Sequence, residues 1–313
     1  MKVNLYPLVR GIASYLLPKA FFKRPGSGGT FSSEYCYSVW LRHLSWLHKN
    51  KLFQRPEEIV NVAEIGPGDS LGIGLAALFT GARHYFAFDV IAHANVESNV
   101  AVSRDLMEYF KNSKEIPNGS KFLTTNPILE DYSFPSSILS ISEQVYKQKH
   151  IEIDKALRGE EDAEVSIKYV VPWNSGTHND IKEIDLIFSQ AVMEHVADID
   201  FAYSEMYKWL RPGGIISHQV DFKTHEMTKE WNGHWFISDK VWAILAHGRK
   251  YPMNRLPLSS HLRSIERAGF VIKSIIPVNK INLLINQKTK VPGVDFTAED
   301  LVTSSALIQA VKI

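Results

Sequence analysis

The stretch Val62-Ala-Glu-Ile-Gly-Pro-Gly-Asp-Ser-Leu-Gly72 decides the fold. It joins an apolar run at 59–65 to a helix-compatible segment at 71–79, and a second strand-like run at 84–88 ends at Asp89. A strand, a glycine turn, a helix, a strand and an acid in this order form the first half of a nucleotide-binding α/β unit. Glycine lets the backbone approach a ligand closely and adopt positive φ. The stretch therefore predicts a nucleoside site, with Asp89 accepting hydrogen bonds from the ribose hydroxyls.

Size and composition restrict the class of protein. The chain has 313 residues and 45% apolar content, enough for one large domain with a real core and smaller additions. Its formal net charge is +1 and no dense basic run occurs, which argues against nucleic acid as a partner. The one cysteine, Cys36, excludes an intrachain disulfide and is typical of a reducing, cytoplasmic location. We expect it to be a buried, inert thiol.

The first residues are apolar and need a separate interpretation. Residues 5–22 faintly resemble a secretion signal, but Pro7 and Arg10 interrupt them and no clean small-residue cleavage site follows. The segment is also too short and interrupted to span a bilayer. We expect an amphipathic helix that docks on the protein, and contact with a membrane surface is the less favoured alternative. This predicts a helical extension over 1–55, followed by the main domain over 56–313.

Strand-like and helix-like segments alternate over the rest of the chain, which predicts a parallel sheet covered by helices on both faces. Ligands of such sheets bind at the carboxyl ends of the strands. Two stretches, at about 97–160 and 222–258, break the alternation, and we expect both to form cap or substrate-binding insertions at those ends. The expected strands are 59–65, 84–88, 165–171, 184–189, 215–220, 270–278 and 306–311.

Further blocks narrow the class of ligand. The third glycine of the turn, Gly72, falls one place late for the dinucleotide pattern G-x-G-x-x-G. Glu64 precedes the first glycine by two, where a carboxylate suits a cationic sulfonium better than a pyrophosphate. With IDLIFSQAVMEHV at 184–196 and WLRPGGIIS at 209–217, the chain resembles class I S-adenosylmethionine-dependent methyltransferases over about residues 59–220.

The resemblance implies S-adenosylmethionine as the cofactor and a Rossmann-like methyltransferase sheet, mostly parallel with an antiparallel last strand. It assigns Asp89 to the ribose and the residues after the third strand to the adenine, where many relatives carry an aspartate and this chain has Trp173. Ser189 and Gln190 would face the methionine moiety or the acceptor. The cofactor-binding set that it implies is Glu64, Gly66, Gly68, Ser70, Asp89, Trp173, Asn174, Ser189 and Gln190.

The nature of the acceptor decides whether a base is needed. A hydroxyl loses a proton when it attacks a methyl group, and a positioned base accelerates such a step about 10²–10⁴-fold. The candidate catalytic residues follow the fourth and fifth strands: His195, His218, Asp221 and His225. They fit either a histidine base oriented by a carboxylate or a metal site made by His218, Asp221 and His225. We favour the base and assign no metal, and His195 fits a packing role as well as a catalytic one.

A looser resemblance suggests the acceptor. Residues 218–255, together with Tyr37-Ser-Val-Trp-Leu-Arg-His43, look like methyltransferases of bacterial glycan and polysaccharide biosynthesis. This implies O-methylation of a sugar or glycan-precursor hydroxyl, because aromatic rings stack on sugars and Asn or Arg donates to hydroxyls or phosphates. The expected acceptor-binding residues are Trp235, Tyr251, Asn254 and Arg255. The alternatives are a small natural product or lipid-like alcohol as acceptor, and a non-catalytic cofactor-binding or scaffold protein. A homodimer is compatible with all of these interpretations.

Overall fold

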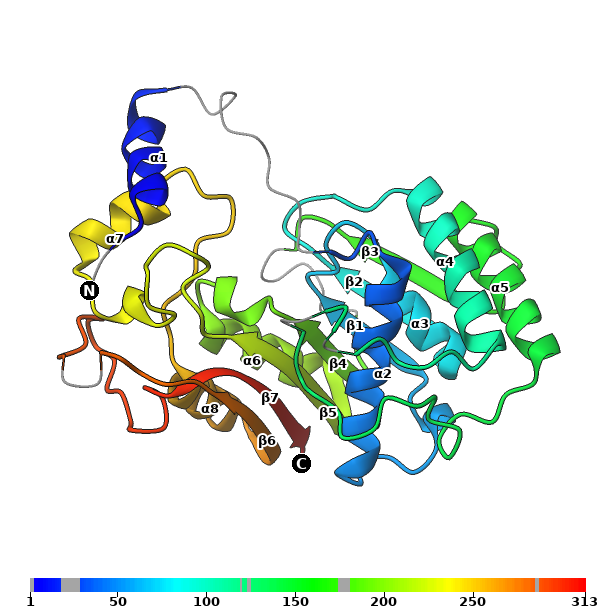
Figure 1. Cartoon of the computed structure of the whole chain (residues 1–313). Coiled ribbons are helices and arrows are strands. Elements are labelled where there is room, and N and C mark those ends of the chain that lie inside the picture. The colour runs from blue at the N-terminus through cyan, green and yellow to red at the C-terminus, as the bar shows by residue number, and fades with distance from the viewer. Residues whose placement is uncertain (1–2, 18–28, 119, 123–124, 174–180, 285–286) are drawn as a thin grey trace.

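The computed structural model describes residues 3–17, 29–118, 120–122, 125–173, 181–284 and 287–313. Within them a seven-stranded sheet runs in the order β3-β2-β1-β4-β5-β7-β6 (Figure 1). The strands are β1 (Asn61–Ile65), β2 (His84–Phe88), β3 (Ser166–Val170), β4 (Ile184–Gln190), β5 (Leu210–Asp221), β6 (Phe270–Asn279) and β7 (Thr303–Lys312). The first five pair in parallel, and β7 runs antiparallel to both β5 and β6. The mostly parallel sheet with an antiparallel last strand is confirmed.

Burial along the strands follows their position in the sheet. Six of the seven residues of β4 are buried, as expected of a central strand with both faces covered. The edge strand β6 alternates between exposed and partly buried residues after Phe270. Successive residues of β1 serve different cores, because Val62 belongs to one apolar cluster and Ala63 to the other. The sheet thus separates two hydrophobic cores.

The first core lies between the sheet and a layer of four helices: α2 (Ser33–Lys49), α3 (Gly72–Thr80), α4 (Val96–Lys111) and α5 (Glu143–Arg158). α2 is buried along most of its length, so this part of 1–55 belongs to the main domain and not to an extension. The helix contacts α3 closely where Gly72 meets Cys36; a Cβ on Gly72 would lie 2.5 Å from the Cys36 Sγ. Cys36 is fully buried, and burial raises the pKa of its thiol.

The position of α4 and α5 corrects one expectation. Both helices of the 97–160 segment pack on the face of the sheet through apolar side chains such as Leu106, Phe110 and Ile153. Among the described residues of this segment, none lines the cavity at the strand ends. The long connection between β2 and β3 is a crossover with a second helix, and its described residues form no cap over the cavity.

The second core lies under α6 (Ile199–Trp209) and α8 (Leu258–Arg267) on the opposite face. α6 ends at Trp209, and residues 210–214 already belong to β5, ahead of the expected strand 215–220 and with a register irregularity against β4. A 3₁₀ turn at Gly233–Trp235 and the helix α7 (Asp239–Ala246) follow in the segment 222–258.

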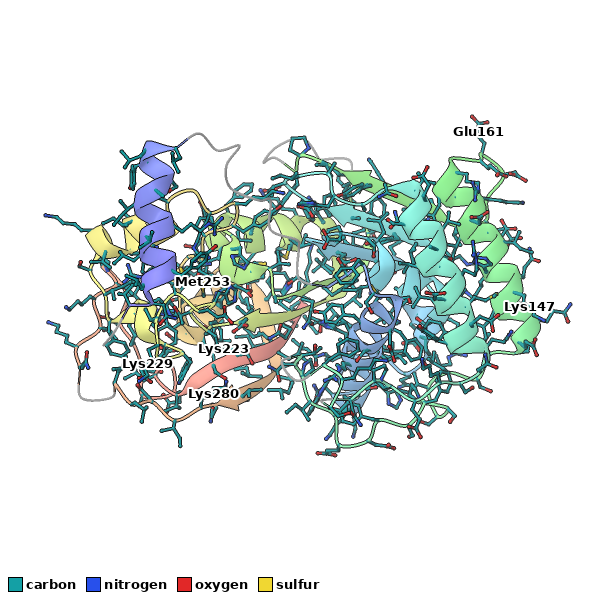
Figure 2. The ribbon with its side chains drawn as sticks, turned by 45° about the horizontal axis from the view of Figure 1, so that its top comes forward. Lys147, Glu161, Lys223, Lys229, Met253 and Lys280 are labelled. Carbon is teal, nitrogen blue, oxygen red and sulfur yellow. The ribbon has the colours of Figure 1, made fainter. Side chains whose placement is uncertain are left out.

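The helix α1 (Leu5–Leu16) packs on α7, and the pair stands apart from the sheet (Figure 1). Tyr15 stacks on His247 with ring centroids 3.5 Å apart, and a Cβ on Gly11 would collide with the Ile244 backbone. The docked helix is therefore as expected, although its other side leaves large apolar side chains exposed. No described helix has the length and apolar character to cross a membrane. Figure 2 shows the outer surface, with Lys147 and Glu161 projecting at the α5 end.

Candidate active site

A cavity of about 750 Å³ opens at the carboxyl ends of β1, β2 and β4. Its walls include the glycine turn after β1, Asp89 after β2, Trp173 after β3 and Gln190 at the end of β4. The segment 222–258 contributes His225, Arg249, Lys250 and Tyr251 to the wall. This is the place where parallel α/β sheets bind ligands, and the volume suits a nucleoside together with a second small molecule.

The glycine turn has the conformation that the sequence requires. Gly66 and Gly68 have φ of +71° and +77°, which other residues rarely adopt. The Gly66 N–H donates to the Phe88 carbonyl (2.8 Å), and a Cβ on Gly66 would lie 2.6 Å from a methyl group of Val192. The turn therefore packs against the loop that follows β4, and only glycine fits at position 66.

Asp89 lines the cavity beside this turn and is nearly buried. One carboxylate oxygen accepts from the Val90 N–H (2.7 Å) and the other from the Gly68 N–H (3.3 Å). These bonds hold the carboxylate at the position where the sequence places the ribose. Trp173 also lines the cavity, and its buried Nε1 has no hydrogen-bond partner among the described residues. The neighbouring Asn174 lies outside the described residues.

Two residues of the expected cofactor set lie behind the cavity. Glu64 is buried, accepts a hydrogen bond from the Tyr85 hydroxyl and does not line the cavity. Burial raises the pKa of Glu64 to about 8, so the carboxyl is largely neutral at pH 7 and offers little charge to a sulfonium. Ser70 is turned toward Thr30, and it is Thr30 that reaches the cavity wall.

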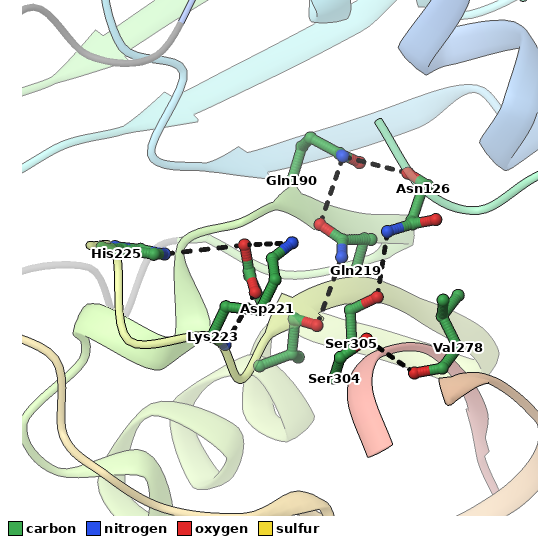
Figure 3. A network of polar contacts seen from close by, with 10 residues as sticks. Asn126, Gln190, Gln219, Asp221, Lys223, His225, Val278, Ser304 and Ser305 are labelled. Atoms are coloured by element: carbon green, nitrogen blue, oxygen red, sulfur yellow. Dashed lines mark hydrogen bonds and ion pairs between the residues drawn. The ribbon is translucent and has the colours of Figure 1, made fainter. Parts of the chain in front are cut away.

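Neighbouring residues at the end of β4 point to opposite faces of the sheet. Gln190 lines the cavity, and its amide is held by His43 (3.3 Å), the Asn126 carbonyl (3.0 Å) and Gln219 (3.2 Å; Figure 3). Ser189 faces the other way and hydrogen-bonds His218 (2.8 Å) in the second core. Strand alternation therefore removes Ser189 from the cavity wall.

His218 is the clearest departure from the expected catalytic group. The side chain is fully buried beside Tyr203 and His261, away from the cavity. Burial lowers the pKa of His218 to about 3. A histidine in this position cannot reach an acceptor, so His218, which the sequence placed in both the catalytic set and the alternative metal set, is neither the base nor a ligand at the cavity.

The other candidate catalytic residues do come together. His195 and His225 both line the cavity, with ring centroids 5.3 Å apart. The Nε2 of His225 lies 3.6 Å from Oδ2 of Asp221, and the same oxygen pairs with Lys223 Nζ at 2.9 Å (Figure 3). Burial lowers the pKa of His195 to about 4, so its imidazole is neutral at pH 7. His225 has φ of +47°, a strained backbone of the kind found at functional sites.

Of the four expected acceptor-binding residues, only Tyr251 lines the cavity. Asn254 Nδ2 donates to the carbonyls of Met193 and Val196 (2.9 Å each) and so holds the turn that carries His195. Trp235 is fully buried in the second core. The buried guanidinium of Arg255 donates to the carbonyls of His234 (2.9 Å) and Ile237 (2.7 Å) and pairs with Asp239 (2.9 Å). These three residues support the site without facing it.

Three cations at the cavity wall were not expected from the sequence: Arg10, Arg249 and Lys250. Arg10 comes from α1, and the other two follow α7. Burial, together with the charge of Arg10, lowers the pKa of Arg249. Such a pair of half-buried arginines favours an anionic ligand. Nothing in the local sequence shows this, since only the packing of α1 on α7 brings the two arginines together.

The family model described as "Methyltransferase domain" matches residues 151–217. The match runs from α5 through β3, β4 and α6 into β5, and so includes the loop that carries His195. No curated protein matches the whole chain significantly by sequence.

The fold is also similar to solved methyltransferase structures. A structure from Methanosarcina mazei has 11% identity and a TM-score of 0.45, covering 82% of this chain and 93% of its own. A putative sarcosine dimethylglycine methyltransferase from Galdieria sulphuraria has 11% identity and a TM-score of 0.43, covering 87% and 84%. A TehB-like methyltransferase from Corynebacterium glutamicum has 11% identity and a TM-score of 0.37, covering 88% and 98%.

Residues 151–217 are thus similar to a methyltransferase domain, and the glycine turn and the cavity lie at the carboxyl ends of the strands.

Proposed function

We propose that this protein is a class I S-adenosylmethionine-dependent methyltransferase that O-methylates a hydroxyl of a saccharide or glycan precursor in the cytoplasm. When bound, S-adenosylmethionine supplies a methyl group carried on a positively charged sulfur. Gly66, Gly68, Asp89 and Trp173 would hold its nucleoside half, because they line the cavity just after β1, β2 and β3. The acceptor would then lie on the side of His195 and His225.

The observation that carries the proposal is the group of His195, His225 and Asp221 beside the cavity. An amine acceptor needs no strong base, whereas a hydroxyl must lose a proton as it attacks. With the Nε2–H of His225 directed at Asp221, Nδ1 of the same ring can accept that proton. The Asp221 carboxylate then stabilises the imidazolium, while Gln190, fixed by three partners, can orient the acceptor.

The cations at the wall support an acceptor that carries negative charge. Arg10, Arg249 and Lys250 come from two segments of the chain and all line the cavity. A sugar bearing a phosphate group combines hydroxyls for methylation with an anion for these side chains. Tyr251, held by His93 (2.8 Å), offers a ring on which a sugar could stack.

An acceptor panel tests this proposal. The purified protein is supplied with S-adenosylmethionine bearing a labelled methyl group, together with neutral sugars, sugar phosphates, lipid-like alcohols and small amines. We expect label in sugar phosphates. Transfer only to a lipid-like alcohol would favour the natural-product alternative, and transfer only to amines would contradict the proposal. Tight cofactor binding with no transfer in any arm would favour a scaffold protein.

A further inference from the structure

A group of metal-ligating side chains borders the acceptor half of the cavity. Glu194, His195 and His225 each place one possible ligand atom within 4.8 Å of the others. Glu194 is 1% exposed, and neither of its carboxylate oxygens has a hydrogen-bond partner among the described residues. The buried Nδ1 of His195 also lacks one. Leaving a buried polar group unsatisfied is costly, and more so for a charged one, so these atoms are suited to bind a ligand.

We propose that Glu194, His195 and His225 bind one divalent transition-metal cation of the Mn²⁺, Co²⁺ or Zn²⁺ kind. One carboxylate and two imidazoles are ligands that such ions accept, and three protein ligands leave coordination positions open. Because His195 and His225 both line the cavity, the open positions would face the acceptor.

The local backbone fixes the positions of Glu194, His195 and His225. Glu194 and His195 lie on the 3₁₀ turn Met193–His195. Asn254 stabilises this turn by donating hydrogen bonds to the carbonyls of Met193 and Val196. His225 is held at φ +47° in a loop that begins directly after β5. Such fixed, strained placement is common at ligand-binding positions and needs no rearrangement on binding.

Asp221 fits the role of an outer partner. A metal-binding histidine usually donates its other ring N–H to a carboxylate, which fixes the tautomer and the ring orientation. The Nε2 of His225 faces Asp221 at 3.6 Å, which leaves Nδ1 for the cation. Lys223 pairs with Asp221 at 2.9 Å and so balances the second acid near the site. This set differs from the grouping of His218, Asp221 and His225, since His218 is buried elsewhere.

The role of the cation rests on the proposed function, whereas its binding does not. An acceptor hydroxyl that occupies an open position would have its pKa lowered by the cation and would lose its proton to solvent water. His225 would then be a ligand and not the base. The cation therefore changes how the hydroxyl loses its proton, and the acceptor stays in the same half of the cavity.

The test is cation binding by the full-length protein after treatment with a chelator. Isothermal titration with Mn²⁺ should show one site per chain, and Co²⁺ should give a visible d–d absorption spectrum. Glu194→Gln and His225→Ala should each weaken Mn²⁺ binding at least tenfold. His84→Ala, which removes a histidine at the start of β2, should bind as the wild type does. Titration with S-adenosylhomocysteine shows whether each variant is still folded at the cofactor site.

Absence of binding by the wild type overturns the proposal, and so does unchanged binding in both Glu194→Gln and His225→Ala. Should Glu194→Gln fail to fold, His225→Ala alone decides, since its side chain is partly exposed. If the chelated protein methylates a sugar phosphate at the full rate, the cation has no role in catalysis and the proposed function survives. If the protein binds the cation but methylates only amines, the proposed function fails and the cation site survives.

Discussion

The carboxylate of Asp89 accepts a hydrogen bond from the backbone N–H of Gly68, at 3.3 Å. This bond joins the acid after β2 to the glycine turn after β1, so the two residues expected to bind the nucleoside form one polar rim. The carboxylate is thereby oriented before the cofactor arrives, which lowers the entropic cost of binding.

Replacing Asp89 by Asn should weaken the binding of S-adenosylhomocysteine about 10–100-fold, because hydrogen bonds to a charged group contribute about 1.5–3 kcal/mol. Isothermal titration gives the dissociation constant directly. Asp131→Asn, at an exposed acid in the connection between α4 and α5, is the matched control and should bind normally. Equal affinity in both variants would contradict the assignment of Asp89 to the ribose.

Gly66→Ala should destabilise the protein by more than the backbone strain alone. The strain of a non-glycine residue at positive φ costs about 1–3 kcal/mol, and the new methyl group would also collide with Val192. Gly159→Ala is the control, because Gly159 has φ of +77° and no atom lies within 4 Å of its added Cβ. Urea unfolding should give a clearly larger loss for Gly66→Ala.

The double variant Gly66→Ala/Val192→Ala separates the two causes. Removing the Val192 side-chain methyl groups should recover the part of the loss that comes from the collision and leave the strain of positive φ. If the double variant regains none of the lost stability, the added methyl group at position 66 does not collide with Val192 in the loop after β4.

Arg249→Met should raise the KM for a phosphorylated sugar about 10–100-fold while the affinity for S-adenosylhomocysteine stays the same. The substitution removes a charged donor and keeps much of the apolar stem. Steady-state kinetics on the acceptor found by the panel gives KM and kcat separately. The exposed Arg55→Met is the control. An unchanged KM would show that the cations at the wall do not select the acceptor.

Buried histidines should make stability depend on pH. The pKa values of His43, His195 and His218 fall to about 4, 4 and 3 in the folded protein, below the ordinary value of 6.5. Between the ordinary pKa and these lowered values, the unfolded chain binds more protons than the folded protein. The free energy of unfolding should therefore fall as the pH drops from about 6.5 toward 4. Glu64 acts oppositely: its folded pKa of about 8 favours the folded state at low pH, and this contribution is lost as the pH rises through 8.

Burial also lowers the pKa values of His234 and His261 to about 3 and raises that of Glu194. Five histidines outweigh two carboxyls in the acidic range, so urea unfolding at pH 7, 6 and 5 should show a steady loss of stability. His218→Asn should make the dependence shallower, because it removes one group that must stay neutral in the core. A flat profile across this range would contradict the burial of these histidines.

The sequence predicts the sheet well because its signals are local. β2 matches the expected range, and the turn at Gly66 and Gly68 requires positive φ, as the pattern indicates. The acceptor side depends on contacts between distant segments, which local patterns do not encode. Strand alternation turns Ser189 and His218 into the second core, and α1 brings Arg10 to the cavity across 239 residues of sequence from Arg249. Apolar helix faces likewise place α4 and α5 on the sheet and not over the cavity.

The most direct test of the central claim is the chemical position of the transferred methyl group. The wild-type protein and His225→Ala are incubated with a phosphorylated amino sugar, which offers both hydroxyl and amine acceptors, and with S-adenosylmethionine carrying a ¹³C-labelled methyl, and the product is examined by NMR. Our account predicts an O-methyl signal with the wild type and at least a tenfold lower rate with His225→Ala, at unchanged affinity for S-adenosylhomocysteine. A methyl group on nitrogen, or an equal rate in the two proteins, would contradict it.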